Sequence, residues 1–411
     1  MIFIDCYIIT PDRSPAGLSR GGGLALGNPP LDQQGVRAEL DGLTAPSEAS
    51  RGSRGPHDAT ASATPAALAA SEVGYRGYAA AGETGASVTQ PADACDVRIL
   101  ETLDAVAQDR WNGVVAHAPQ GSVFHRYEWL HAIETGLGAT PRHLLVTKDG
   151  NPIGLLPHFV RALPVVPFRR LQSLYPGFGG PAITTDAAAV LSRMTATVPA
   201  CCSGRTIVHE IRACNTDYLR YSTLLRAQGY RLARLTGRFQ LRLEQGYARI
   251  WDGMSTTRRK EIRRGRERDA DIVEEPITRA TLRRFYQAYT RHMAQVGGDP
   301  YPFAFFAALQ AMADRLLVLT LRIDGDYAGG FLELLDDDQD TVHGLFAAVP
   351  EDDRDAHASA LLYDHVTCWA IDHGYATYDF GGRRTTSGGG RSALRRVSGA
   401  SSSRTATGNA A

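Results

Sequence analysis

The sequence passes twice through the same series of predicted elements. In each round helical segments come first, a strand–turn–strand follows, and a further helix ends in Gly-Tyr before a last strand. The two turns carry Asp-Gly pairs, Asp149-Gly150 in "TKDGNPIG" and Asp324-Gly325 in "RIDGDYAG". An Asp-Gly pair between two apolar runs is typical of a β-hairpin. We therefore predict an α+β fold of two similar units, with mainly antiparallel sheets and helices on both sides of them.

The two predicted units differ in composition from the segments that flank them. We place the first unit at 96–245 and the second at 246–382. Residues 1–95 are rich in Gly, Ala, Ser, Pro and Thr, and most of this stretch shows neither helical nor strand periodicity. Residues 383–411 contain no aromatic and no acidic side chain. Because such segments bury too little apolar surface to offset their chain entropy, we predict disordered termini at 1–95 and 383–411.

Charge and cysteine usage narrow the classes of function. The 44 basic and 44 acidic residues give a formal net charge of +0, which argues against a nucleic-acid or membrane partner held by bulk charge. The six cysteines show no Cys-x-x-Cys or Cys/His ligand spacing, so we predict no metal site. The start "MIFIDCYIIT" lacks the basic region of a signal peptide, and no apolar run reaches the roughly 20 residues that span a bilayer. We expect free thiols and a cytoplasmic protein.

Four segments that follow one another resemble a known family. They are "HLLVTKDGNPIGLLPHFV", "STTRRKEIRRGRE", "LRIDGDYAGGFLEL" and "ASALLYDHVTCWAIDHGYATYDFGG". Their order is similar to that of the FemAB-like, double-GNAT acyltransferases, in the group often labelled BioF2-like. The resemblance covers about residues 97–382 and implies two tandem GNAT-like halves.

The resemblance also implies an activity. We expect an enzyme that moves an acyl group, with acyl-CoA as co-substrate and no permanently bound cofactor. The acceptor would be an amine or hydroxyl of a sugar, lipid or peptide precursor, with cell-surface polysaccharide synthesis as the expected setting. One alternative is a Fem-type enzyme that uses aminoacyl-tRNA, which would make tRNA a partner. The other alternative is a non-catalytic, truncated remnant of the family.

The C-terminal segment departs from the family pattern. In the family, "YDFGG" is followed by a segment that contains Phe-Lys and by a further strand, whereas no lysine follows Lys260 here. We interpret the Arg-, Ser- and Gly-rich tail as the product of a frameshift just after Gly382, with a genuine disordered tail as the alternative.

The segment "STTRRKEIRRGRER" supplies the predicted donor-binding residues. Helical spacing places Arg259 and Arg263 on one face, with Arg258 beside them. Such a cationic face suits the phosphates of CoA or the backbone of tRNA. A solvated surface helix is the alternative interpretation.

Tyr289 and His292 are predicted to be neighbours on one helix face because they lie three residues apart. The resemblance implies that this helix lines the acceptor cleft, where a histidine could deprotonate an amine. A half-buried packing face is the alternative interpretation.

Two further residues come from the resemblance. His343 lies on the strand that precedes the CoA-binding helix of GNAT folds, so we group it with the donor site. The following segment "EDDRD" is acidic and lacks the glycine-rich signature for pyrophosphate. Asp379 in "YDFGG" is the residue the resemblance marks best, as a carboxylate that orients or deprotonates the nucleophile. The alternative is an aspartate that fixes the next turn through backbone N–H groups. The loop "YPGFGG" (175–180) is expected to line the cleft from the first half.

Overall fold

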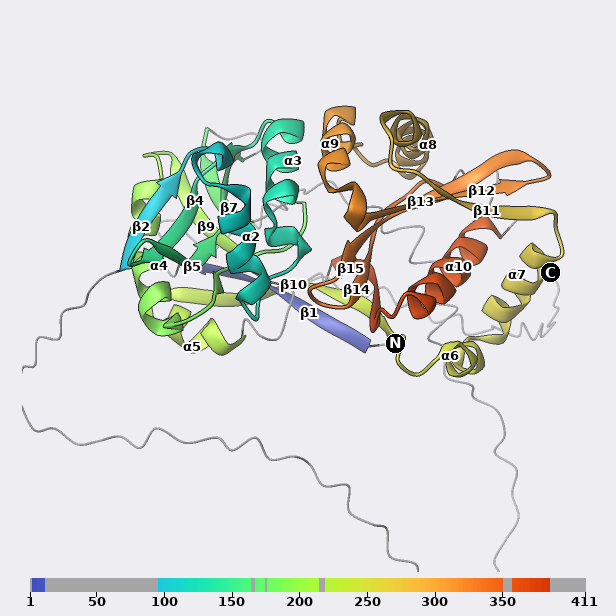
Figure 1. Ribbon diagram of the computed structural model, residues 1–411, viewed down its shortest axis with the longest axis horizontal. Coiled ribbons are helices and arrows are strands. Elements are labelled where there is room, and N and C mark those ends of the chain that lie inside the picture. The colour runs from blue at the N-terminus through green and yellow to red at the C-terminus, as the bar shows by residue number, and fades with distance from the viewer. Residues whose placement is uncertain are drawn as a thin grey trace, which may run out of the picture.

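The computed structural model describes residues 2–11, 95–163, 167–173, 176–213, 219–349 and 357–384. Two sheets and their flanking helices make up this part of the chain (Figure 1). The larger sheet has 11 strands in the order β11-β12-β13-β14-β15-β10-β1-β9-β7-β6-β3, and the smaller has four in the order β2-β4-β5-β8. The prediction of an α+β fold with mainly antiparallel sheets is confirmed, because among the described strands only the β7–β9 and β14–β15 pairs are parallel.

The first half begins with β2 and ends with β10. Its strands are β2 (Cys95–Leu100), β3 (Thr140–Pro141), β4 (His143–Lys148), β5 (Asn151–Leu156), β6 (Phe159–Ala162), β7 (Arg169–Ser173), β8 (Ala182–Ile183), β9 (Thr206–Ala213) and β10 (Tyr230–Arg242). Its α-helices are α2 (Gln108–His117), α3 (Tyr127–Leu137), α4 (Ala187–Cys201) and α5 (Leu219–Ala227), and its short 3₁₀ turns are η1 (Leu103–Ala105) and η2 (Val123–His125).

The second half repeats this series. Its strands are β11 (Ala270–Glu275), β12 (Leu316–Ile323), β13 (Asp326–Asp336), β14 (Thr341–Ala347) and β15 (Thr377–Arg384). Its helices are α6 (Tyr247–Gly253), α7 (Thr256–Arg266), α8 (Arg279–Val296), α9 (Phe303–Ala308), the 3₁₀ segment η4 (Leu309–Arg315) and α10 (Ala358–Asp372). In Figure 1, α8 and α9 lie on one side of this part of the sheet, and α6, α7 and α10 lie on the other.

Both predicted hairpins have the expected turn geometry. Asp149 and Gly150 join β4 to β5 with φ values of +51° and +76°, and Asp324 and Gly325 join β12 to β13 with +54° and +88°. Two successive positive φ values are what a type I′ turn requires, and Asp-Gly tolerates them well. In each half a helix then connects a parallel pair, α4 between β7 and β9 and α10 between β14 and β15.

The two halves share one hydrophobic core. In it Trp129 of α3 packs edge-on against Phe305 of α9, with ring centroids 5.7 Å apart. A Cβ on Gly136 of α3 would come within 2.5 Å of the Phe305 Cα. The two helices therefore approach closely because position 136 has no side chain.

The N-terminal strand β1 (Ile2–Pro11) differs from the expectation for residues 1–95. It pairs antiparallel with both β10 and β9 and is blue in Figure 1. The composition of the whole flank hid a short run of β-branched and aromatic residues, which favour an extended strand. Residues 12–94, and the tail beyond Arg384 with its expected frameshift, lie outside the described residues. None of the helices in the described ranges is long and apolar enough to cross a membrane.

Candidate active site

Asp379 of β15 is the centre of a buried polar cluster at the junction of the two halves. One carboxylate oxygen, Oδ2, accepts hydrogen bonds from Arg238 Nε at 2.7 Å and from Gln240 Nε2 at 2.9 Å. Burial by itself would raise the pKa of Asp379, but the Arg238 charge, the proximity of His343 and these hydrogen bonds outweigh it and lower the pKa. Asp379 is therefore held as a carboxylate.

A β-bulge fixes the local geometry of this strand. Arg238 pairs with Gly382 and Gln240 pairs with Asp379, so β15 carries one extra residue between them. Gly381 has a φ of +91° and donates its backbone N–H to Asp379 Oδ1 at 2.9 Å. Oδ1 of Asp379 thus fixes the following turn, as the alternative interpretation holds, while Oδ2 accepts the hydrogen bonds of Arg238 and Gln240. Bulges of this kind often re-aim side chains next to active sites.

His343 of β14 lies between Asp379 and a second buried carboxylate. Its Nδ1 is 3.9 Å from Asp379 Oδ2, and its Nε2 is 3.6 Å from Oδ2 of Asp336, the last residue of β13. Neither carboxylate oxygen of Asp336 has a hydrogen-bond partner among the described residues. His343 is slightly exposed, with 12% of its side chain accessible, whereas both carboxylates are about 1% accessible. The imidazole is therefore the member of this group that solvent or a ligand can reach.

Aromatic side chains from the first half cover this cluster. The Arg238 guanidinium lies over the Phe178 ring, with its Cζ 4.6 Å from the centroid, and the Phe124 ring is 5.0 Å from His343. Gly177 has a φ of +97°, and a Cβ there would come within 2.6 Å of the Phe124 ring. The part of the predicted Gly/Pro loop from Pro176 onward thus does border the cluster, while Tyr175 lies outside the described residues.

The hairpin between β13 and β14 ties the cluster to the first half. Arg126 makes a bidentate ion pair with Asp338, in which Nε donates to Oδ2 and Nη2 donates to Oδ1, each at 3.0 Å. Gln339 Nε2 donates to the Gly121 carbonyl at 2.8 Å. These contacts lie between Asp336 and His343 in the sequence, so they help to set where those two side chains stand.

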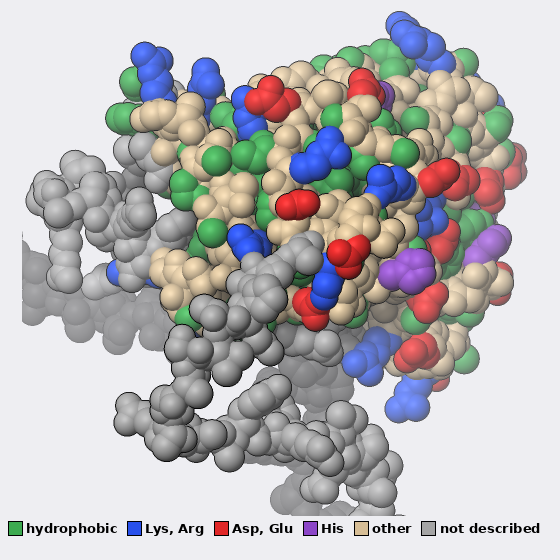
Figure 2. All heavy atoms as spheres, turned by 60° about the vertical axis from the view of Figure 1, so that its left-hand side comes forward, with side chains coloured by type: hydrophobic (Ala, Val, Ile, Leu, Met, Phe, Trp, Pro, Cys, Tyr) green, Lys and Arg blue, Asp and Glu red, His purple; other side chains and the backbone are tan. Residues whose placement is uncertain are grey.

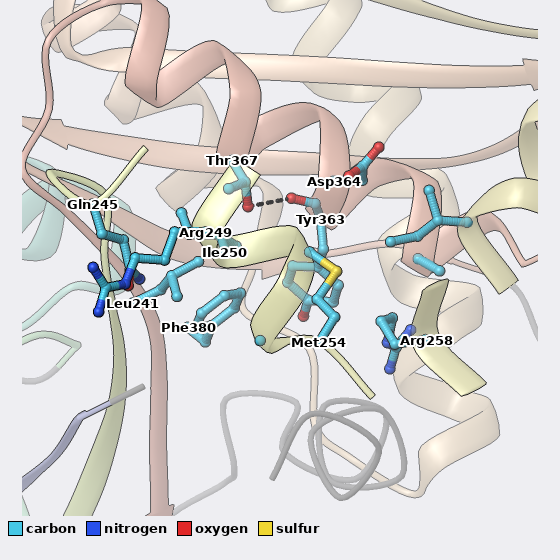
Figure 3. A pocket seen from close by; sticks show the side chains of 13 residues that line it. Leu241, Gln245, Arg249, Ile250, Met254, Arg258, Tyr363, Asp364, Thr367 and Phe380 are labelled. Carbon is cyan, nitrogen blue, oxygen red and sulfur yellow. Dashed lines mark hydrogen bonds between the residues drawn. The ribbon is translucent and has the colours of Figure 1, made fainter. Parts of the chain in front are cut away.

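A pocket lies on the other face of β15 (Figure 3). Side chains alternate between faces along a strand, so Phe380 points into this pocket while Asp379 points into the cluster. The pocket has a volume of about 160 Å³ and is lined mainly by apolar residues of β10, α6, α7, α10 and β15. In Figure 3, Arg249 and Leu241 lie toward one end and Met254 and Arg258 toward the other. The volume is smaller than the roughly 300 Å³ of typical small-molecule sites, so the pocket suits part of a ligand.

Only one of the three predicted donor-binding arginines contributes to this pocket. Arg258 is buried, lines the pocket and pairs with Glu261 at 3.1 Å. Arg259 does not line it, and Arg263 is exposed with its guanidinium over the Trp251 ring. Figure 2, turned toward the first half, shows acidic and basic side chains interspersed on that face, in keeping with the net charge of +0.

The structure separates the other predicted residues into two groups. His343, which we grouped with the donor site, lies in the Asp379 cluster and not beside Arg258. Tyr289 belongs to the core shared by the two halves, where its ring packs against Phe306 and Phe346 at 5.2 Å each. His292 is buried as well.

Sequence reasoning did not identify Arg238, Gln240 or Asp336. Arg238 and Asp379 are 141 positions apart, and nothing in the alternating pattern of β10 sets Arg238 apart from its other arginines. Asp336 opens the run "DDDQD", which reads as an ordinary polar turn.

Known proteins are similar to this chain in one domain family and in fold. Residues 256–390 match the acetyltransferase (GNAT) domain family. The crystal structure of FemX is similar, with a TM-score of 0.54 and 13% identity over 69% of this chain and 89% of that one. The structure of L-PGS from Bacillus licheniformis has a TM-score of 0.46 and 13% identity, over 67% of this chain and 76% of that one. No curated protein is similar in sequence.

Proposed function

We propose that the protein is an acyltransferase whose acceptor binds at the Asp379 cluster, because residues 256–390 match the acetyltransferase (GNAT) domain family and the fold is similar to that of FemX. The observation that carries the proposal is the position of His343. It stands on β14 between two buried carboxylates, Asp336 and Asp379, and it is the member of this group that a ligand can reach. The nucleophile and the thioester carbon must both lie on this face of the sheet to react, so in this proposal the pocket on the other face of β15 holds no reacting atom.

The chemistry assigned to the cluster is proton transfer coupled to acyl transfer. A nitrogen or oxygen of the acceptor attacks the carbonyl carbon of a thioester, so that a C–N or C–O bond forms. The C–S bond breaks, and the thiolate leaves with its electron pair. His343 takes the proton of the nucleophile, and Asp336 and Asp379 offer charge compensation to the resulting imidazolium.

The donor in this proposal is acyl-CoA, a co-substrate available in the cytoplasm. Support for a CoA donor comes from the match of residues 256–390 to the acetyltransferase (GNAT) domain family. The acceptor is an amine or hydroxyl of a sugar, lipid or peptide precursor.

Thiol release from acetyl-CoA, measured with a panel of amino sugars and amino acids, tests the proposal. His343→Gln should lower kcat by roughly 10²–10⁴-fold without weakening donor binding. The matched control is His117→Gln, because His117 is an exposed residue that only bonds the Gly113 carbonyl of its own helix. Full activity of the His343 variant would remove this residue from the mechanism, and a folded protein that binds no acyl donor would favour the non-catalytic remnant.

A second candidate is a Fem-type transferase that uses aminoacyl-tRNA. The basic helix α7 favours it, since Arg263, Arg264 and Arg266 are exposed. Binding of tRNA should then weaken steeply as salt rises, with a log–log slope of about −0.7 per neutralised phosphate on a single strand. Binding that does not change with salt would exclude this candidate.

A further inference from the structure

Strand β1 joins two groups of strands within the 11-stranded sheet, whereas the two halves of the chain are already joined by the β10–β15 pair. On one side of it the order runs β11-β12-β13-β14-β15-β10, and on the other it runs β9-β7-β6-β3. In the described chain no other strand pairs with both groups, so without β1 the large sheet would separate into six strands and four. Two strands, β9 and β10, would then have unpaired backbone edges.

The register places β1 between the two strands that carry Arg238 and Arg212. On one edge Ile2 pairs with Gln240 and Ile4 with Arg238. On the other edge Ile8 pairs with Arg212 of β9. Both guanidinium groups lie over the same ring, Phe178, with their Cζ atoms at 4.6 and 6.0 Å from its centroid. The position of β1 between β9 and β10 therefore sets the spacing between two arginines of the first half, Arg212 and Arg238, which lie in the two different groups of strands.

The position of β1 is determined by the strand itself and not by its sequence neighbours. Residues 12–94 separate it from β2, so no short connection forces it between β9 and β10. Its sequence, IFIDCYIITP, is dominated by β-branched and aromatic residues, which favour extended pairing. The entropy of closing such a long connection grows only slowly with its length. The segment thus has the properties of a peptide ligand that adds a strand to exposed sheet edges.

We propose that the gap between β9 and β10 is a strand-binding site for an extended apolar peptide, and that residues 2–11 are its tethered occupant. Main-chain hydrogen bonds to both edges give the affinity. Occupation of the site joins the two groups of strands on either side of β1 and holds Arg238 and Arg212 in register. The proposal concerns backbone pairing, so it stands or falls independently of the acyltransferase activity.

Hydrogen exchange of the full chain tests this site with an Ile8→Pro variant. Residue 8 pairs on both sides, so its N–H faces one neighbouring strand or the other, and proline removes that donor. Exchange in 206–213 and 230–242 should become about tenfold faster or more, while 316–336 in β12 and β13 stays protected. Ile8→Val is the matched control and should leave all these segments unchanged. Unchanged protection of β9 and β10 in the proline variant would overturn the proposal.

A synthetic peptide with the sequence MIFIDCYIITP gives a second measurement on the same variant. Added at about 100 μM, it should restore protection of β9 and β10, because the vacated edges accept it in trans. This arm also decides the case in which Ile8→Pro loses protection everywhere. Rescue by the peptide would support the strand site, and failure of the peptide to bind or rescue would overturn it.

Discussion

At the scale of single residues, the Arg238–Asp379 pair is both a stability element and part of the candidate site. The two groups are 5% and 1% exposed, and their 2.7 Å contact is charge-assisted. Asparagine at position 379 would leave the Arg238 guanidinium buried without its counter-charge. Removing one partner of such a pair costs far more than the pair contributes over apolar residues.

We expect Asp379→Asn to lower the free energy of unfolding by roughly 3–5 kcal/mol, measured by urea denaturation. The double variant Arg238→Met/Asp379→Leu should lose less, because no unpaired charge is left behind. Asp186→Asn, in the exposed pair with Lys148, is the surface control and should change the unfolding midpoint little. A single variant that is no less stable than the double variant would contradict this account.

A chain of buried histidines sets the response of the first half to acid. His158 donates its backbone N–H to His143 Nδ1, its Nε2 lies 2.8 Å from His209 Nε2, and His209 Nδ1 lies 2.7 Å from the Tyr230 hydroxyl. One hydrogen is shared between the two Nε2 atoms, so the rings cannot both be protonated there. Burial lowers the pKa of His143 and of His209 to about 3. Among the described residues, no cluster of His, Cys, Asp or Glu side chains could hold a metal ion.

These lowered pKa values predict loss of stability in mild acid. The unfolded histidines bind protons below about pH 6.5, whereas the folded ones stay neutral to about pH 3, so the unfolded state gains protons first. Stability is therefore fully present above pH 6.5 and should fall as the pH drops, by about 1.4 kcal/mol per pH unit for each such histidine well below pH 6.5. Urea unfolding at pH 7, 6 and 5 measures the slope. His209→Phe should reduce it, and His117→Gln should not.

At the scale of elements, close contact between helices depends on glycine at particular positions. Gly136 of α3 lies where a Cβ would meet the backbone of Phe305 at 2.5 Å, and backbone atoms cannot rotate away. Gly113 of α2 has nothing within 4 Å of its Cβ position. Glycine is therefore needed for helix packing at position 136, whereas at position 113 it only lowers the helix propensity of α2.

We expect Gly136→Ala to destabilise the protein by about 1–3 kcal/mol, because α3 and α9 must move apart. Gly113→Ala should stabilise it by roughly 0.5–1 kcal/mol through better helix propensity. Thermal unfolding of the two variants beside the parent chain measures both signs. Equal shifts of the unfolding temperature in the same direction would show that the α3–α9 contact does not require glycine at position 136.

At the scale of the whole molecule, the shared core and the Arg126–Asp338 pair make the two halves one cooperative unit. Trp111 and Trp129 lie in the first half and Trp251 and Trp369 in the second, so fluorescence can follow each half separately. The core clusters described above contain Trp129 together with Phe305 and Phe346, which no single half could bury alone.

We therefore expect one unfolding transition for both halves. A Trp129→Phe/Trp251→Phe/Trp369→Phe variant keeps only Trp111, which reports on the first half. Its fluorescence midpoint in urea should coincide with the midpoint from far-UV circular dichroism. Two separated midpoints would show that the halves unfold independently.

The sequence by itself determined the elements whose signals are local. The Asp-Gly turns fixed both hairpins because two adjacent residues supply the whole turn geometry, and the repeated series predicted two similar halves. Asp379 was singled out because its segment "YDFGG" resembles a segment of the FemAB-like family.

Only the tertiary structure decided which distant groups meet. Arg238 reaches Asp379 across 141 positions, and His343 joins them because β14 and β15 pair in parallel over three residues. The position of β1 between β9 and β10 likewise depends on two edges that lie some 200 residues away in the sequence. Such contacts follow from strand order and register, which many local patterns satisfy equally well and which burial of the shared core selects.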